Sequence, residues 1–189
     1  MPYSQNSTDK VLVTGCQKQH RLAQKYLYQR YFGRMLGICM RYTNHRSEAE
    51  DVLNRAFLKV FQSIHKYEPK GSLGGWIARI VFNSSIDYVR SRVKYRQIMD
   101  FNTEKDIAIQ PDAIEQLYAY DLFKIIQQLP ENTRIIFSLY VVDGYKHREI
   151  ADLLGITIST SKWHLANGKK ILKKRLEANY PVILQKLAS

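Results

Sequence analysis

The chain has 189 residues, 45% of them hydrophobic, which is enough for one ordinary domain or two small ones with a core. Its 29 Lys and Arg residues against 17 Asp and Glu residues give a net charge of +12, which favours a polyanionic partner, either nucleic acid or an anionic membrane surface. No apolar run approaches the roughly 20 residues of a membrane span, and the N-terminus lacks a signal-peptide core. We therefore expect a protein of the reducing cytoplasm, with Cys16 in a loop and Cys39 in a helix core.

Helical periodicity organises the first part of the chain. Residues 1–18 are polar and predict an N-terminal tail. Apolar and aromatic residues then recur at helical spacing over 19–42 and again over 52–64. Before the second helix, the run Ser47-Glu48-Ala49-Glu50 predicts a capping box, in which the serine oxygen and a glutamate each accept a hydrogen bond from an unpaired helix amide.

A third helix is expected after Gly71, with Trp76 and Val81 on its buried side and a basic run at its far end. A tryptophan on the apolar side of a helix more often belongs to the core than to a site. Phe82 and Tyr88 fit either the core or a surface on which bases stack.

Residues 98–113 are polar, show no period and predict a linker. Beyond it, 114–129 is expected to be helical, Pro130 marks a new start, and 134–142 predicts a short buried helix. The expected architecture is all-α, with two small helical lobes joined by the linker.

The segment from Glu149 to Thr157 has the pattern of a helix-turn-helix. Ala151 is small where two helices cross, Gly155 suits a left-handed turn, and Thr157 can cap the next helix. An ordinary helical hairpin is the alternative interpretation. The helix that follows begins with polar and aromatic side chains that can reach base edges and ends with cations suited to phosphate, which are Lys169, Lys170, Lys173, Lys174 and Arg175.

The sequence contains no nucleophile–base pair, no phosphate-binding loop and no set of metal ligands, so we expect neither enzymatic activity nor a cofactor or metal. The acidic residues Glu48, Glu50 and Asp51 fit the start of a helix, where they complement its dipole. They could form a metal site only with a further acid or histidine, and none is suitably spaced.

Taken in order, several short patterns resemble the extracytoplasmic-function (ECF) group of bacterial RNA polymerase sigma factors. The resemblance covers about residues 20–95 and 115–176. In the first stretch it rests on Ala49-Glu50-Asp51-Val52, Ala56-Phe57-Leu58-Lys59-Val60-Phe61, Gly75-Trp76-Ile77-x-x-Ile80-x-x-Asn83 and Asp87-x-x-Arg90. In the second it rests on Gln128-Leu129-Pro130, Arg134, Gly144-Tyr145, Glu149-Ile150-Ala151 and Gly155-Ile156.

The resemblance implies that residues 19–97 form sigma region 2, which binds the polymerase clamp and opens the minus-ten element. It implies that residues 114–180 form sigma region 4, which reads the minus-thirty-five element. The expected partners are core RNA polymerase and promoter DNA, as duplex and as melted non-template strand. An anti-sigma factor is a further candidate partner. The residues expected to bind polymerase are Asp51, Asn54, Arg55 and Leu58, which lie off the apolar stripe of their helix.

Two further sets of residues are expected to contact DNA. Those for the minus-ten element combine positive charge with an amide that suits a base edge, and they are Arg79, Asn83, Arg90 and Arg92. Those for the minus-thirty-five element are Arg148, Ser159, Thr160, Lys162, Trp163, His164 and Lys169.

The second lobe departs from the family pattern at several positions. Ser161 stands where a buried apolar residue is usual, so it should weaken helix packing or find a hydrogen bond. Trp163 and His164 replace small and basic residues, and this tryptophan could read thymine methyl groups. Gly168 lies inside a helix, where glycine costs about 1 kcal/mol relative to alanine. Lys146 replaces the usual capping serine or threonine.

Two other function classes compete with a sigma factor. A stand-alone helix-turn-helix regulator would bind duplex DNA unaided, but it leaves the pattern over 49–96 unexplained. A purely protein-binding helical module would have no need of the arginine and lysine runs. Dependence of promoter binding on polymerase separates these classes.

Overall fold

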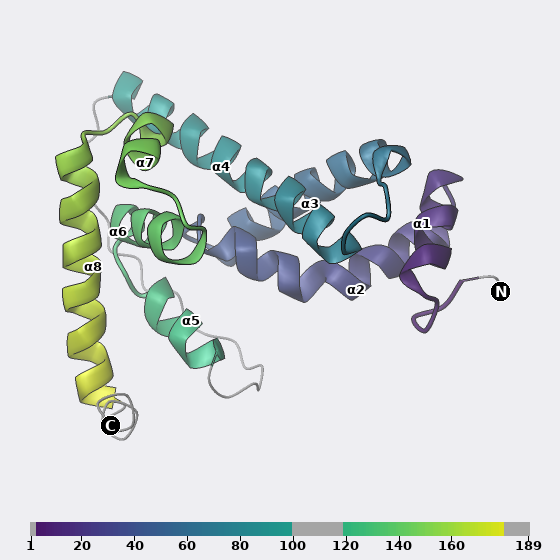
Figure 1. The fold of residues 1–189 in the computed structure, drawn as a ribbon, viewed down its shortest axis with the longest axis horizontal. Coiled ribbons are helices and arrows are strands. Elements are labelled where there is room, and N and C mark those ends of the chain that lie inside the picture. Colours follow the sequence, from purple (N-terminus) through teal and green to yellow (C-terminus); the bar gives the residue numbers. More distant parts are fainter. Residues whose placement is uncertain (1–2, 100–118, 180–189) are drawn as a thin grey trace. The chain divides into compact units, whose positions relative to one another are not determined.

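The computed structural model describes residues 3–99 and 119–179, with side chains placed over 3–93 and 123–177. The chain divides into two compact units, Met1–Ser91 and Arg92–Ser189. Helices are the only extended regular elements in the described residues, so the all-α prediction is confirmed (Figure 1). The expected linker, 98–113, lies outside the described residues apart from its first two, which continue a helix. The first five residues of the helix expected over 114–129 also lie outside them.

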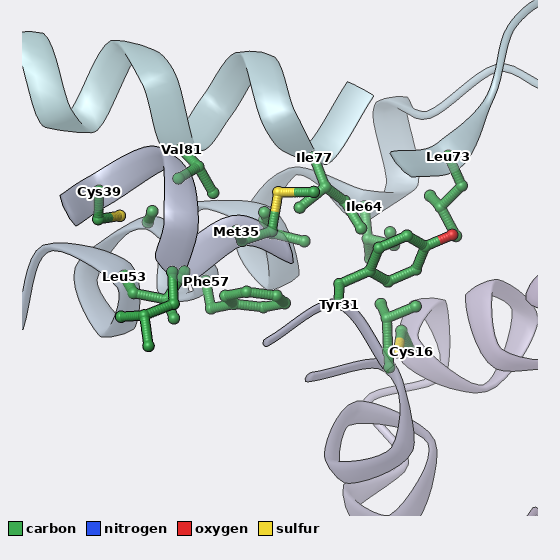
Figure 2. Close-up of a cluster of buried hydrophobic side chains, with 14 of the residues drawn as sticks. Cys16, Tyr31, Met35, Cys39, Leu53, Phe57, Ile64, Leu73, Ile77 and Val81 are labelled. Carbon is green, nitrogen blue, oxygen red and sulfur yellow. The ribbon is translucent and has the colours of Figure 1, made fainter. Parts of the chain in front are cut away.

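The first unit is built from three helices and the greater part of a fourth. They are α1 (Asp9–Gln17), α2 (Arg21–Met40), α3 (Arg46–Ser63) with a short 3-10 turn η1 (Ile64–Lys66), and α4 (Leu73–Met99) as far as Ser91. Their apolar stripes meet in one core, in which side chains of α2 face those of α4 (Figure 2). Its central members include Leu27, Met35, Leu53, Phe57 and Ile77, each no more than 2% exposed.

Helix α1 corrects the prediction of a polar tail over residues 1–18. Thr8 Oγ1 accepts a hydrogen bond from the Val11 amide at 3.4 Å and caps the helix. Leu12 and Cys16 lie on its inner face and are buried in the core, so the expectation of a loop thiol is also wrong. The helix was missed because the segment is polar on average and its apolar stripe lies within a helix of only nine residues. Burial raises the pKa of the Cys16 thiol to about 11, and the thiol stays protonated at neutral pH.

Asp9 fastens α1 and the chain before it to α2. Its carboxylate accepts a hydrogen bond from Arg30 Nη1 at 2.7 Å and another from the Tyr31 hydroxyl at 2.7 Å. Arg30 also donates to the carbonyl oxygens of Gln5, at 2.6 Å, and Ser7. These contacts join residues more than twenty positions apart, so sequence periodicity could not reveal them.

The start of α3 corrects the expected capping box. The helix begins at Arg46, with His45 as its N-cap, two residues earlier than the pattern indicated. Glu48 Oε2 accepts hydrogen bonds from the amides of Asn44, at 2.9 Å, and His45, at 3.3 Å. Ser47 is exposed within the helix, and Glu50 pairs with Arg46 at 2.9 Å. Glu48 therefore caps the helix in place of Glu50, two residues later.

The described part of the second unit holds α5 (Ala119–Gln127), α6 (Glu131–Phe137) with a π-helical turn η2 (Ser138–Val142), α7 (His147–Leu154) and α8 (Ile158–Asn179). The helix expected over 134–142 thus begins three residues earlier, directly after Pro130, and ends in the π-turn. Its core packs α5, α6 and α8 together through Ile125, Ile126, Leu129, Phe137, Leu165 and Leu172.

Gly168 lies where α8 packs tightly against α6. A Cβ atom at this position would lie 3.0 Å from Thr133 Cγ2 and 3.4 Å from Phe137 Cδ2. The cost of glycine in the middle of α8 is therefore offset by closer packing of the two helices.

Candidate nucleic-acid interface

Local hydrogen bonds build the helix-turn-helix of α7 and α8 as the sequence predicted. Glu149 Oε2 accepts from the Lys146 amide at 2.7 Å, so a glutamate three residues on caps α7 although Lys146 offers no capping oxygen. Gly155 takes the left-handed conformation, with φ 66° and ψ 34°, and turns the chain. Thr157 Oγ1 then accepts from the Thr160 amide at 3.0 Å and caps α8.

A hydrogen bond between the two helices satisfies the buried Ser161 hydroxyl. Ser161 is 0% exposed, and its Oγ lies 2.9 Å from Nδ1 of His147, the first residue of α7. This imidazole also stacks on Tyr140, with ring centroids 4.5 Å apart and planes at 26°. The expectation of a compensating hydrogen bond is confirmed, and its partner ties the start of one helix to the first turns of the next.

One exposed stripe runs along α8. At about 100° per residue, every third or fourth position shares a face. The exposed positions between Ser159 and Lys174 follow this rule, and the buried ones, Ser161, Leu165, Gly168 and Leu172, lie on the opposite face. The exposed stripe consists of Ser159, Lys162, Trp163, Ala166, Lys169, Lys170, Lys173 and Lys174. It carries five cations, which suit a polyanion.

The structure brings four of the seven residues expected at the minus-thirty-five element to this stripe, namely Ser159, Lys162, Trp163 and Lys169. Arg148 is exposed on α7 instead. Thr160 and His164 lie at the edge of the stripe, half-buried and engaged within the protein. The Thr160 hydroxyl is 2.8 Å from the Thr157 hydroxyl, and His164 Nδ1 is 3.0 Å from Thr133 Oγ1.

The structure gives two other residues of α8 positions that the sequence did not predict. Arg175, grouped with the phosphate-binding lysines, donates to the backbone oxygen of Gln128 at 3.1 Å and to its side-chain Oε1 at 2.7 Å, so it joins α8 to the turn before α6. Ala166 was not singled out, yet it lies in the middle of the exposed stripe, three residues after Trp163. Helical spacing from Lys162 and Trp163 was the signal that could have identified it.

The basic face of α4 holds three of the four residues expected at the minus-ten element. Arg79, Asn83 and Arg90 are exposed and lie within about 40° of one another around the helix axis. Arg92 is half-buried and lies on the opposite side of the helix, because thirteen residues turn it by about 220° relative to Arg79. The structure therefore does not bring Arg92 to this face.

The aromatic residues of α4 belong to packing. Trp76 is half-buried against the core, with its ring centroid 5.4 Å from that of Tyr67. Phe82 meets Tyr42 edge-on at 5.9 Å, and Tyr88 packs against the same core. Of the two interpretations left open for Phe82 and Tyr88, the contacts favour the core.

The outer face of α3 presents the four residues expected to bind polymerase. Asp51, Asn54, Arg55 and Leu58 are all exposed, and the exposed fraction of Leu58 is 61%. A leucine side chain that is exposed to this degree offers an apolar surface that a partner protein can contact. Asn54 Oδ1 accepts a hydrogen bond from the Tyr28 hydroxyl at 2.8 Å, which fixes the amide in place.

The described part of the chain contains neither a group of metal-ligating side chains nor a helix suited to span a membrane. Within 3–99 and 119–179, no three His, Cys, Asp or Glu residues are grouped so that they could hold a metal ion. Among the helices of the same residues, none has both the length and the apolar character that a membrane span requires.

Comparison with known proteins connects the two segments that carry these faces to one family. The family model of Sigma-70 region 2 matches residues 27–95, and that of Sigma-70, region 4 matches residues 121–172. The first match contains α3 and the basic face of α4, and the second contains the helix-turn-helix as far as Leu172.

Individual relatives agree with the family matches. The ECF RNA polymerase sigma factor SigE of Mycolicibacterium smegmatis is 28% identical over 156 residues, which are 79% of this chain and 60% of that protein. The chain thus matches less than two thirds of that relative. The RNA polymerase sigma-H factor of Pseudomonas aeruginosa is 24% identical over 185 residues, or 89% of this chain and 94% of that protein.

A solved structure shares the fold. The sigma factor RpoE of Bartonella quintana, solved in complex with the anti-sigma factor NepR, aligns with a TM-score of 0.51 at 20% identity, over 82% of this chain and 97% of that one. The two family matches, in the order region 2 then region 4, and the ECF relatives lead to one conclusion: this chain belongs to the ECF group of the sigma-70 family of RNA polymerase sigma factors.

Proposed function

We propose that this chain binds core RNA polymerase and directs it to promoters, where it recognises two DNA elements and helps to open the duplex. Polymerase performs the chemistry, and the chain supplies specificity as a transcription initiation factor of the cytoplasm. The observation that carries the proposal is that each unit matches a sigma region and presents an exposed face suited to that region's ligand.

The outer face of α3 binds the polymerase clamp in this proposal. Leu58 provides the apolar anchor, and Asp51 and Arg55 provide charges around it. Interfaces of this kind draw most of their affinity from a few central side chains surrounded by polar ones. The Tyr28–Asn54 hydrogen bond orders one of those polar side chains before the partner arrives.

The basic face of α4 follows the melted strand at the minus-ten element. Asn83 lies between two arginines, and its amide offers a donor and an acceptor to a base edge. Arg79 and Arg90 lie about 6 Å before and about 10 Å after it along the helix, distances comparable to the spacing of one or two nucleotides. The arginines hold the phosphates while the amide reads an unstacked base.

The exposed stripe of α8 enters the major groove at the minus-thirty-five element. Its first turns, with Ser159, Lys162 and Trp163, meet base edges, and the lysines that follow meet phosphate. Phosphate contacts position a protein without specifying sequence, so discrimination between promoters depends on the first turns of the helix. Arg148 on α7 supplies a further phosphate contact.

Reconstitution with bacterial core RNA polymerase tests this function. The purified chain is mixed with core enzyme, and the complex transcribes a library of random promoters whose start sites are sequenced. We expect a stable complex and new start sites that share two upstream elements. Tight binding of the chain alone to duplex DNA, with no effect on polymerase, would instead support a stand-alone helix-turn-helix regulator.

A matched pair of variants tests the polymerase-binding face. Leu58→Asp places a charge on the α3 face, and Val11→Asp places the same charge at an apolar position of α1 that is 42% exposed. We expect Leu58→Asp to weaken core binding by at least about tenfold, as truncation of an interface anchor does, and Val11→Asp to leave it unchanged. Equal effects of the two variants would remove α3 from the interface.

Regulation by an anti-sigma factor is a separate proposal, supported by the shared fold with a sigma factor that was solved with such a partner. Co-purification of the tagged chain from its native cell, with and without added core polymerase, tests it. A protein that binds the chain and is displaced by core enzyme is the expected result.

A further inference from the structure

We propose that Trp163 reads the 5-methyl group of a thymine in the upstream promoter element, and that His164 is a positioning residue that holds the Trp163 ring. This inference rests on the proposed function of α8 and names the chemistry by which its first turns select a base. It also reassigns His164, expected to contact DNA, to a role within the protein.

The exposed position of Trp163 carries the first part of the inference. Trp163 is 61% exposed in the exposed stripe, although an indole is one of the largest apolar side chains. Lys162 and Ser159 lie beside it, and Lys169 lies on the same stripe. A large apolar surface bordered by cations fits a ligand that is anionic overall and apolar at one point. In the major groove, the thymine 5-methyl is the only apolar group that a base presents.

A chain of contacts that begins in the core carries the second part. Thr133 of α6 is 1% exposed, and its Oγ1 lies 3.0 Å from Nδ1 of His164. The His164 ring meets the Trp163 ring edge-on, with centroids 4.8 Å apart and planes at 79°. This buried threonine therefore fixes an imidazole, and the imidazole supports one side of the exposed indole. Edge-on aromatic pairs are favourable, and a ring held before binding loses less entropy on contact with DNA.

The two parts together distinguish Trp163 from the lysines beside it. A lysine contributes affinity to any sequence, because phosphates are present at every step of the duplex. A rigid indole placed against the groove contributes only where a methyl group meets it. Trp163 is therefore the large apolar side chain of the exposed stripe, and it favours thymine over other bases.

Replacement of thymine by deoxyuridine tests the reading role, because it removes only the methyl group. The holoenzyme first selects promoters from the random library, and each thymine of the upstream element is then replaced singly by deoxyuridine. Open-complex formation is measured with the unaltered chain, with Trp163→Ala and with Lys162→Ala. Burial of one methyl group corresponds to about fourfold in binding.

We expect one or two thymines at which the unaltered chain loses about fourfold and Trp163→Ala loses nothing further. Lys162→Ala should bind all templates more weakly and keep the methyl effect. The inference is overturned if no upstream thymine is sensitive, if the sensitivity persists in Trp163→Ala, or if that variant loses core polymerase binding, which would place the indole in a protein interface. A chain that forms no active holoenzyme overturns the proposed function as well, so the two failures differ.

The positioning role of His164 is tested by Thr133→Val, which keeps the shape of the side chain and removes the hydroxyl. In the same deoxyuridine assay, we expect Thr133→Val and His164→Ala to reduce the methyl effect while core binding is retained. Fluorescence anisotropy of Trp163, measured after Trp76→Phe removes the other tryptophan, should fall in both variants because the ring becomes freer. Unchanged anisotropy together with an unchanged methyl effect would overturn the positioning role.

Discussion

The hydrogen bond between His147 and Ser161 should couple the two helices of the DNA-reading motif strongly enough to measure. We consider His147→Ala, Ser161→Ala and the double variant. Ser161→Ala removes one hydrogen bond and leaves a half-buried imidazole that water can reach, so it should lower the free energy of unfolding of the second unit by about 1 kcal/mol.

His147→Ala should cost more because two contacts are lost. The Ser161 hydroxyl, 0% exposed, would lose its partner, at about 1–3 kcal/mol. The Tyr140 ring would lose a stacking partner at 4.5 Å, at about 0.5–1.5 kcal/mol. The double variant has no buried hydroxyl to leave unpaired, so its loss should be smaller than the sum of the single losses by about 1–2 kcal/mol.

Urea unfolding at pH 8, where histidine is neutral, measures these values. Trp163 fluorescence in a Trp76→Phe background reports on the second unit alone, since the chain has two tryptophans and each unit contains one. Ser159→Ala, an exposed serine on the same helix, is the control, and its cycle with His147→Ala should be additive within about 0.5 kcal/mol. Additivity in the Ser161 cycle would refute the proposed coupling. So would a stabilising Ser161→Ala.

Three further predictions follow from particular contacts. Burial and the charges of Lys162 and Lys169 lower the pKa of His147 below its ordinary 6.5, so on acidification the unfolded chain takes up a proton before the folded one does. The second unit should therefore lose stability as pH falls through that value, and urea titrations should show a smaller loss in His147→Asn; equal pH slopes would contradict this. Gly168→Val should lower its stability by about 1–3 kcal/mol in the same assay, because a Cβ would already lie 3.0 Å from Thr133, whereas Ala166→Val on the exposed face should cost less than about 1 kcal/mol. Asn83→Ala should impair open-complex formation on duplex promoters more than on pre-melted ones, and equal losses on both templates would exclude Asn83 from base reading.

Some features that depend on residues within about one helical turn were predicted from the sequence alone, although the cap of α3 was expected two residues too late. The glycine turn at Gly155 and the Thr157 cap arise from bonds that span three to five residues, so a short pattern contains both partners. The exposed face of α3 also follows from the period of its apolar stripe. The net charge predicted a polyanionic ligand, and the order of the motifs predicted the family.

Long-range packing decided what the patterns could not. Helix α1 packs against α2 partly through hydrogen bonds from Arg30 and Tyr31 to Asp9, which lies more than twenty residues away. A local pattern could not show these bonds, so the segment that contains α1 was predicted to be a polar tail. His164 is held within the protein because its Nδ1 lies 3.0 Å from Oγ1 of Thr133. Thr133 lies thirty-one residues earlier in the chain, so no local pattern contains both partners.

Arg175 is another residue whose place was decided by a long-range contact, because it donates to Gln128, forty-seven residues away. From its charge alone, it could not be distinguished from the exposed lysines of α8. A sequence pattern records which side chains share a face of a helix. Which of them are taken up by a neighbouring helix, and which stay exposed to DNA, is decided only when the helices pack, because each contact then excludes water and fixes the partner of every polar group.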